Sequence, residues 1–102
     1  MLSIGIVVRP WIELDRGSRK PAGRHDRIRA FGDTGGIDAG QLLVPWIRYS
    51  GQRDFTTGVA SIKVQSDGTF RWTRLIKKSK GLYAFVSWQD IRSNRVFWRK
   101  VR

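Results

Sequence analysis

Hydrophobic and polar positions alternate along much of the C-terminal half of this chain. Residues 59–65 (VASIKVQ) and 69–76 (TFRWTRLI) are alternating runs, and Asp67 and Gly68 lie between them. Successive side chains of a β-strand point to opposite faces of the sheet, so a period of two predicts a strand. An Asp-Gly pair between two such runs is the strongest short-range indication of a β-hairpin. We therefore predict a hairpin between these two runs, with Ser66, Asp67 and Gly68 in the turn and a positive φ at Gly68.

The same period continues towards the C-terminus. Residues 82–89 (LYAFVSWQ) and 96–99 (VFWR) alternate, and short polar connections separate them from their neighbours. Trp72 and Trp88 lie on the apolar faces of their respective runs. We therefore expect both tryptophans to be buried in one core.

The N-terminal half is less regular. We expect a strand over residues 3–14, with a bulge or a switch between sheets at Pro10, and then a polar loop over 15–25 (DRGSRKPAGRH). A short strand over 27–31 and a glycine-rich loop over 32–40 (GDTGGIDAG) should follow. The last element of this half is a strand over 41–49, with an edge position or bulge at Pro45. Together with the C-terminal runs this makes about seven short strands and no significant helix. Such spacing predicts an all-β fold, a small antiparallel β-sandwich or a small barrel. The length of 102 residues fits a single domain over residues 1–102.

Charge is distributed unevenly along the chain. Twenty Lys and Arg against eight Asp and Glu give a formal net charge of +12. Residues 1–50 carry eight basic and five acidic side chains, whereas residues 51–102 carry twelve and three. This asymmetry favours an acidic partner such as nucleic acid, an anionic membrane or an anionic cell-wall polymer, although a basic surface also serves solubility alone. The chain has no cysteine, which excludes disulfides, thiol chemistry and zinc sites of the Cys type.

No pattern in the chain is typical of a catalytic or cofactor site. His25 is the single histidine and precedes Asp26, but geometry rather than adjacency defines a catalytic triad, and no GxSxG is present. A small hydrolase would need a cleft that joins His25 to a carboxylate and a hydroxyl. Residues 32–40 lack the lysine of a phosphate-binding loop, and Asp33 and Asp38 lack the ligand spacing of a calcium loop. We therefore expect no enzyme, no metal and no cofactor.

The apolar run over residues 1–8 (MLSIGIVV) has neither a basic segment before it nor a small-residue cleavage site, so it does not read as a signal peptide. No apolar run approaches the roughly 20 residues that a membrane-spanning helix needs. A protein of this kind that works outside the cell would need a secretion signal located elsewhere.

Aromatic and basic residues interleave at residues 70–74 (FRWTR) and 97–100 (FWRK). In a nucleic-acid-binding protein, exposed rings stack on bases while Arg and Lys neutralise phosphates. In a strand the same alternation puts the rings on the core face and the cations on the other, which is the interpretation that we favour. One ring of the adjacent Phe-Trp pair must then face outward, as must Tyr83 and Phe85. An exposed aromatic row of this kind would bind sugar rings, bases or another domain.

The C-terminal part of the chain resembles a known kind of domain. The matching elements are residues 67–74 (DGTFRWTR), a following Lys-Lys pair, a strand with a tyrosine, and residues 92–96 (RSNRV), preceded by residues 44–58 (VPWIRYSGQRDFTTG). Over roughly residues 41–101 this pattern resembles the immunoglobulin-like or fibronectin III-like β-sandwich repeats of secreted actinobacterial proteins. The resemblance implies a non-catalytic, extracellular or cell-surface module, and it carries over no site residues.

Two functions are consistent with these patterns. The first is a non-catalytic extracellular binding or spacer module whose basic face meets an anionic cell-wall polymer or a protein partner. The alternative is a small β-barrel that binds nucleic acid without sequence preference through its basic and aromatic C-terminal surface. Burial of Trp72, Trp88 and Trp98 would favour the first, and their exposure on a basic face the second. The expected anion-binding residues are Arg71, Arg74, Lys77, Lys78, Lys80, Arg99, Lys100 and Arg102.

Overall fold

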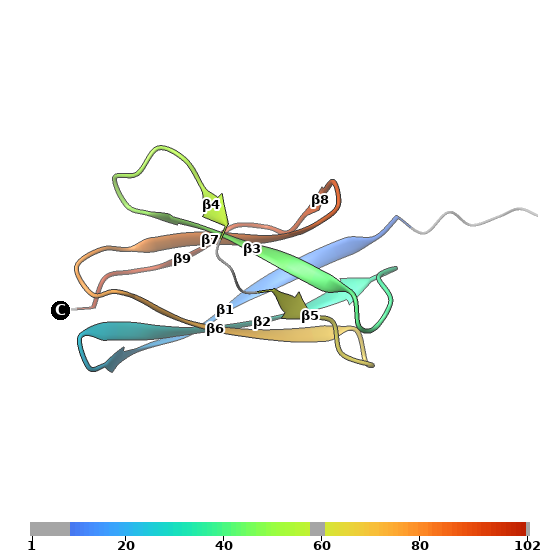
Figure 1. The fold of residues 1–102 in the computed structure, drawn as a ribbon, viewed down its shortest axis with the longest axis horizontal. Coiled ribbons are helices and arrows are strands. Elements are labelled where there is room, and N and C mark those ends of the chain that lie inside the picture. The colour runs from blue at the N-terminus through green and yellow to red at the C-terminus, as the bar shows by residue number, and fades with distance from the viewer. Residues whose placement is uncertain (1–8, 58–60, 102) are drawn as a thin grey trace, which may run out of the picture.

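The fold consists of two antiparallel sheets that face each other as two layers and do not close into a barrel (Figure 1). It was obtained as a computed structural model, which describes residues 9–57 and 61–101. The described residues form no helix, and so none that could cross a bilayer. They form nine strands: β1 (Trp11–Ala22), β2 (His25–Gly35), β3 (Leu42–Tyr49), β4 (Thr56–Thr57), β5 (Ile62–Lys63), β6 (Thr69–Lys77), β7 (Leu82–Trp88), β8 (Ile91–Arg92) and β9 (Val96–Trp98). The predicted all-β class is thus confirmed, and the two strands beyond the expected seven are β4 and β8, each only two residues long.

Strands β1, β2 and β6 form the three-stranded sheet, with β2 in the centre. β1 and β2 are joined as a hairpin whose turn contains Gly23 and Arg24. The predicted loop over residues 15–25 is therefore wrong, because most of that segment is the second half of β1. Two features hide the strand in the sequence. A bulge between Arg16 and Arg19 interrupts the alternation, and the inward side chain of Arg19 is charged although it is buried.

Strand β2 also continues further than predicted, to Gly35, and so includes the first part of the expected glycine-rich loop. Gly32 has a packing role in this strand. A Cβ atom at Gly32 would collide with the ring of Phe70 and with the carbonyl oxygen of Glu13. The glycine therefore lets the fully buried Phe70 ring lie directly against the backbone of β2.

Strands β3 and β7 form the middle of the six-stranded sheet. β8 and β9 pair with β7, while β4 and β5 pair with two separate parts of β3. Pro45 lies between those two parts. Its partner Val86 uses both its amide and its carbonyl in hydrogen bonds with Ser93, so Pro45 and Val86 share no hydrogen bond. The position of the N–H that Pro45 lacks therefore faces away from β7, towards the break between β4 and β5. The proline therefore costs the β3–β7 ladder no hydrogen bond.

The predicted hairpin around Asp67 and Gly68 is correct in its turn and wrong in its pairing. The Gln65 amide donates to the Thr69 carbonyl at 2.8 Å, and Gly68 has a φ of 82°, as predicted. However, β5 pairs with β3 in one sheet, whereas β6 pairs with β2 in the other. The turn therefore carries the chain from one layer to the next. Residues 59 and 60, which the prediction placed at the start of the first hairpin strand, lie outside the described residues.

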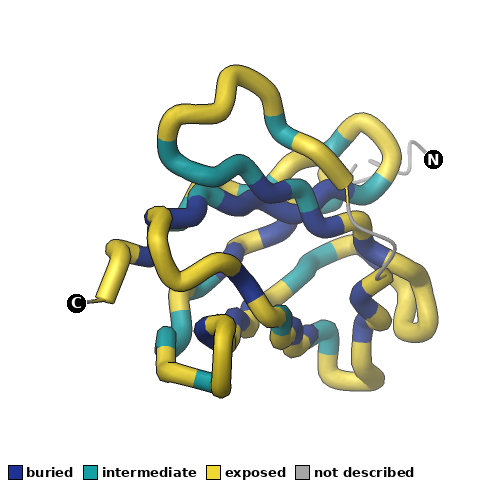
Figure 2. The backbone as a smooth tube through the Cα atoms, turned by 60° about the vertical axis from the view of Figure 1, so that its left-hand side comes forward, coloured by how far each residue is buried: buried dark blue, intermediate teal, exposed yellow. Residues whose placement is uncertain are grey.

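The core lies between the two layers, where inward residues of both sheets are buried (Figure 2). Trp72 of β6 and Trp98 of β9 meet there edge to face, with ring centroids 6.2 Å apart. Trp72 is buried as predicted, while Trp88 is half-buried and packs against the core. Trp72 and Trp98 are therefore core residues, and the predicted full burial of Trp88 is wrong, because Trp88 lies at the edge of the core.

The connection between β8 and β9 ties the two sheets together. The side-chain amide of Asn94 forms two hydrogen bonds with the backbone of Leu14 in β1: Oδ1 accepts from the Leu14 amide at 2.8 Å, and Nδ2 donates to its carbonyl at 2.9 Å. The Ser93 hydroxyl accepts from the Val86 amide of β7 at 2.8 Å. The Ser-Asn pair of the RSNRV segment thus links one strand of each sheet.

Candidate anion-binding surface

The basic residues at one end of the sandwich are organised by a buried arginine. Arg19 lies in the second half of β1, and its Nε donates to Oδ2 of Asp26 in β2 at 2.8 Å. The two side chains are only 4% and 3% exposed. Asp26 alternates with Ile28 and Ala30 on the inward face of β2, so its charge is withdrawn from the surface.

The rest of the Arg19 guanidinium joins two segments that are distant in the sequence. Its Nη2 donates to the carbonyls of Lys77 and Lys78 at 3.0 and 3.3 Å, and its Nη1 donates to those of Trp98 and Arg99 at 3.4 and 3.2 Å. The end of β6 and the chain after β9 are therefore held together, with their side chains directed outward. A guanidinium suits this role because its donors lie in a fixed planar fork.

Five of the eight predicted anion-binding residues lie at this end. Figure 1 shows that the β1–β2 turn, the β6–β7 turn and the C-terminal segment share the same end of the molecule. We call the exposed cations there the basic end, and they are Lys77, Lys78, Lys80, Arg99 and Lys100, with Lys20 and Arg24 from the β1–β2 hairpin. The single carboxylate in the segments that form this end is Asp26, and it is buried against Arg19. These three segments therefore expose cations and no carboxylate.

The structure does not bring the other predicted residues to the basic end. Arg71 pairs with Phe31 in the first half of β6, far along the strand from Lys77. Arg74 lies on the same face of β6 as Trp72, turned towards the other sheet rather than outward. Arg102 lies outside the described residues.

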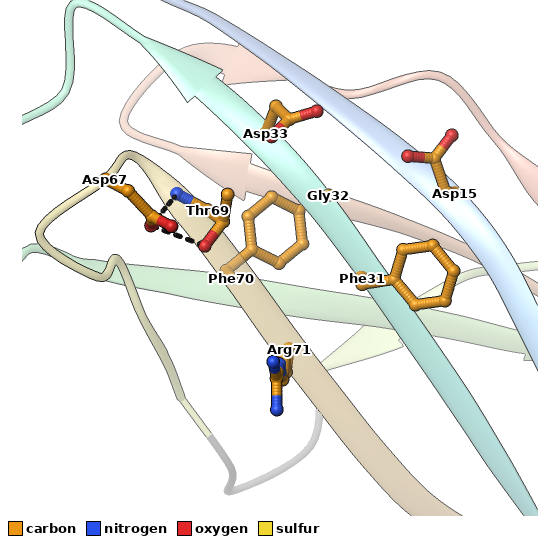
Figure 3. Close-up of a pocket in the computed structure, with 8 residues that line it drawn as sticks. All are labelled: Asp15, Phe31, Gly32, Asp33, Asp67, Thr69, Phe70 and Arg71. Carbon is orange, nitrogen blue, oxygen red and sulfur yellow. Dashed lines mark hydrogen bonds between the residues drawn. The ribbon is translucent and has the colours of Figure 1, made fainter.

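Arg71 instead borders a shallow hollow of about 440 Å³ on the outer face of the three-stranded sheet (Figure 3). Asp15, Asp33 and Asp67 line the same hollow beside the exposed ring of Phe31. The Thr69 hydroxyl donates to Asp67 Oδ1 at 2.6 Å and the Thr69 amide donates to the same oxygen at 3.1 Å, which lowers the pKa of Asp67 below its ordinary value. Arg71 therefore shares its hollow with three carboxylates, unlike the cations of the basic end. No metal-binding cluster of three acidic, histidine or cysteine side chains occurs among the described residues.

The adjacent His25 and Asp26 point to opposite faces of β2. The His25 side chain is exposed, whereas Asp26 is buried. Neighbouring residues of a strand cannot direct their side chains to one site, so this pair is no catalytic dyad. His25 instead stands opposite Lys77, beside the basic end.

A second group of cations, which was not predicted from the sequence, lies on the outer face of the six-stranded sheet. Tyr83, Phe85 and Phe97 face outward there, as predicted for the residues opposite the core face of β7 and β9. Phe85 is nevertheless buried, because Trp46 stacks beside it at 5.8 Å and Phe55 meets it edge-on at 4.8 Å. Three arginines cover these rings: Arg48, Arg92 and Arg95. The one indication of this group in the sequence was the alternation of Arg48 with Trp46 in the segment that forms β3.

Comparisons with known protein families, with curated proteins and with solved structures found no match to this chain.

Proposed function

We propose that this protein is a non-catalytic binding module that holds an anionic polymer at its basic end. The observation that carries the proposal is the buried Arg19–Asp26 pair, which withdraws the Asp26 carboxylate from the surface and gathers the cations of two distant segments. Unpaired lysines on turns form a field of point charges, which suits a repeating polyanion rather than a ligand of defined shape. An anionic cell-wall polymer, met outside the cell or at its surface, is the partner that we propose, in line with the resemblance to secreted sandwich repeats.

The burial of the tryptophans supports this choice over nucleic-acid recognition. Trp72 and Trp98 are 4% and 2% exposed and pack against each other, so neither ring can stack on a base. Binding to DNA would then rest on phosphate contacts alone, which carry no sequence preference.

The test compares two triple variants of equal charge. Lys78→Gln, Lys80→Gln and Lys100→Gln neutralise part of the basic end, and Arg9→Gln, Lys63→Gln and Arg71→Gln remove the same charge away from it. Binding to a poly(glycerol phosphate) teichoic acid and to duplex DNA is titrated at low and at near-physiological salt. For duplex DNA, the slope of log affinity against log salt should fall by about 0.9 for each phosphate contact that is lost.

We expect the basic-end variant to bind both polymers more weakly with a reduced salt slope, and the control to bind nearly as wild type. Equal losses in the two variants would overturn the proposed location. No binding of either polymer at low salt would overturn the proposed function, and tight, salt-resistant binding to one DNA sequence would favour nucleic-acid recognition instead.

A further inference from the structure

Three guanidinium groups come together on the outer face of the six-stranded sheet, each over an aromatic ring. The Cζ atom of Arg48 lies 4.4 Å from the centroid of Tyr83 and 5.3 Å from that of Phe55. The Cζ atom of Arg95 lies 5.1 Å from the centroid of the same Phe55 ring. Arg92 lies 5.3 Å from the centroid of Phe85. Stacking over a ring restricts a side chain that would otherwise sample many rotamers.

The rings bring the three cations close to one another. Arg48 and Arg95 share Phe55, and Phe55 meets Phe85, the ring under Arg92, at 4.8 Å. The Cζ atoms of Arg48 and Arg95 each lie within 5.3 Å of the Phe55 centroid, so these two charges are no more than about 10 Å apart, near one Debye length at physiological salt, and repel each other weakly. Among the residues that the structure describes, the one ion pair is Arg19–Asp26, and no carboxylate pairs with any of these three arginines.

The backbone between Arg92 and Arg95 is held on both sides. Ser93 exchanges hydrogen bonds with Val86 of β7, where its amide donates to the Val86 carbonyl and its hydroxyl accepts from the Val86 amide, both at 2.8 Å. Asn94 forms its two hydrogen bonds with Leu14 of β1. Both arginines therefore start from fixed backbone positions, and the rings fix where their side chains end.

A contact of each guanidinium with an aromatic ring uses none of its N–H groups as a conventional hydrogen-bond donor. Arg48 donates from Nη1 to the Gln52 carbonyl at 2.8 Å. Arg92 and Arg95 donate no hydrogen bond to any described residue, and both are exposed. Planar donors of this kind match the oxygens of phosphate and sulfate in a bidentate way.

We propose that Arg48, Arg92 and Arg95 form a site for a compact tetrahedral oxyanion, a phosphate or sulfate group, distinct from the basic end. The anion neutralises the repulsion among the three cations and accepts from their N–H edges. The same arginine–ring contacts also hold the segment after β3 on the sheet, and this structural role requires no anion. Only the anion-binding role should therefore respond to added phosphate. The inference does not rest on the proposed function, because the probe is free phosphate and the basic end serves as the control.

The test uses inorganic phosphate and sulfate at near-physiological chloride, observed through the Nε–Hε signals of arginine in NMR spectra. The test variant is Arg92→Lys with Arg95→Lys, which keeps the charge and removes both forks. The matched control is the basic-end variant Lys78→Gln, Lys80→Gln, Lys100→Gln. Melting temperature with increasing phosphate gives a second readout, because a ligand that binds only the folded state raises it.

We expect saturable shifts of the Arg48, Arg92 and Arg95 signals in wild type and in the basic-end control, and at least a tenfold weaker affinity in the Lys variant. The phosphate-dependent rise in melting temperature should be smaller in the Lys variant than in wild type. No saturable shift, or an unchanged affinity in the Lys variant, would overturn the site. Titration with the teichoic acid distinguishes the sources of the phosphate. If that polymer requires Arg92 and Arg95 while free phosphate fails to bind, the compact site is overturned.

Discussion

Arg19 and Asp26 face each other across the β1–β2 hairpin, with Arg19 Nε 2.8 Å from Asp26 Oδ2 and both side chains buried. The same guanidinium donates to carbonyls 58 to 80 positions away in the chain, so one side chain joins the hairpin to both segments of the basic end. The geometry of this pair leads to the first prediction.

Asp26→Ala should destabilise the fold by about 3–5 kcal/mol, because it leaves a buried guanidinium without its counter-ion. Urea unfolding measures the change. Arg27→Ala, at the exposed neighbour on the same strand, is the control and should cost little. A midpoint for Asp26→Ala equal to that of wild type would show that the pair does not hold the hairpin.

Asn94→Asp should destabilise the fold at neutral pH by about 1–3 kcal/mol, since a carboxylate cannot donate to the Leu14 carbonyl as Nδ2 does. Protonation of the new carboxyl restores a donor, so its pKa is raised in the folded state. The free energy of unfolding of the variant should therefore rise relative to that of wild type as pH falls through the raised pKa. Urea unfolding at acid and neutral pH, with Asn94→Ala as the control without this recovery, measures it. If the difference in unfolding free energy between Asn94→Asp and wild type did not change with pH, the hydrogen bond from Asn94 Nδ2 to the Leu14 carbonyl would be contradicted.

Trp98→Phe should cost more stability than Trp72→Phe. The indole Nε1 of Trp98 donates to the Gly17 carbonyl at 3.3 Å, whereas that of Trp72 is buried with no hydrogen-bond partner. Both changes leave similar cavities, so the difference should be about 0.5–1.5 kcal/mol, the net worth of one hydrogen bond. Trp72→Ala, which removes the whole ring, should cost about 3–5 kcal/mol. Equal midpoints for the two Phe variants would argue against the Gly17 contact.

Gly68→Val should destabilise the fold by about 1–3 kcal/mol, because a β-branched side chain is strained at a φ of 82°. A Cβ there would also come within 3.2 Å of the Thr34 carbonyl oxygen. Gly68→Asn is the control, since asparagine tolerates the left-handed region better. Thermal melting ranks the three proteins, and an unperturbed melt for Gly68→Val would refute the turn geometry.

Asp67 should titrate below the ordinary aspartate range, because the Thr69 hydroxyl and amide both donate to its carboxylate. Because folding lowers the pKa of Asp67, the ionised carboxylate stabilises the fold at pH values above its unfolded pKa of about 3.9. This stabilisation is lost as pH falls through the lower pKa of the folded state. NMR titration of the Asp67 carboxyl carbon measures the pKa, and Thr69→Val should raise it. An ordinary pKa in wild type, or no rise in Thr69→Val, would contradict these hydrogen bonds.

The sequence by itself determined the class of fold and the inward face of several strands. Alternation is a local property of a pleated strand, so it correctly placed Phe70 and Trp72 on the core face of β6. It also put Tyr83 on the outer face of β7. The conformation of Gly68 was predictable for the same reason, since the Asp-Gly turn depends on neighbouring residues.

Only the tertiary structure decided which strands pair and which charges are buried. β5 pairs with β3 instead of β6 because the chain crosses between layers at the Asp67-Gly68 turn, and no local pattern distinguishes such a crossing from a hairpin. β1 continues through a polar segment because Arg19 finds its carboxylate and carbonyl partners only in the folded chain. The gathering of five predicted cations at the basic end, and of Arg48, Arg92 and Arg95 over their rings, likewise depends on contacts between distant segments, which periodicity does not encode.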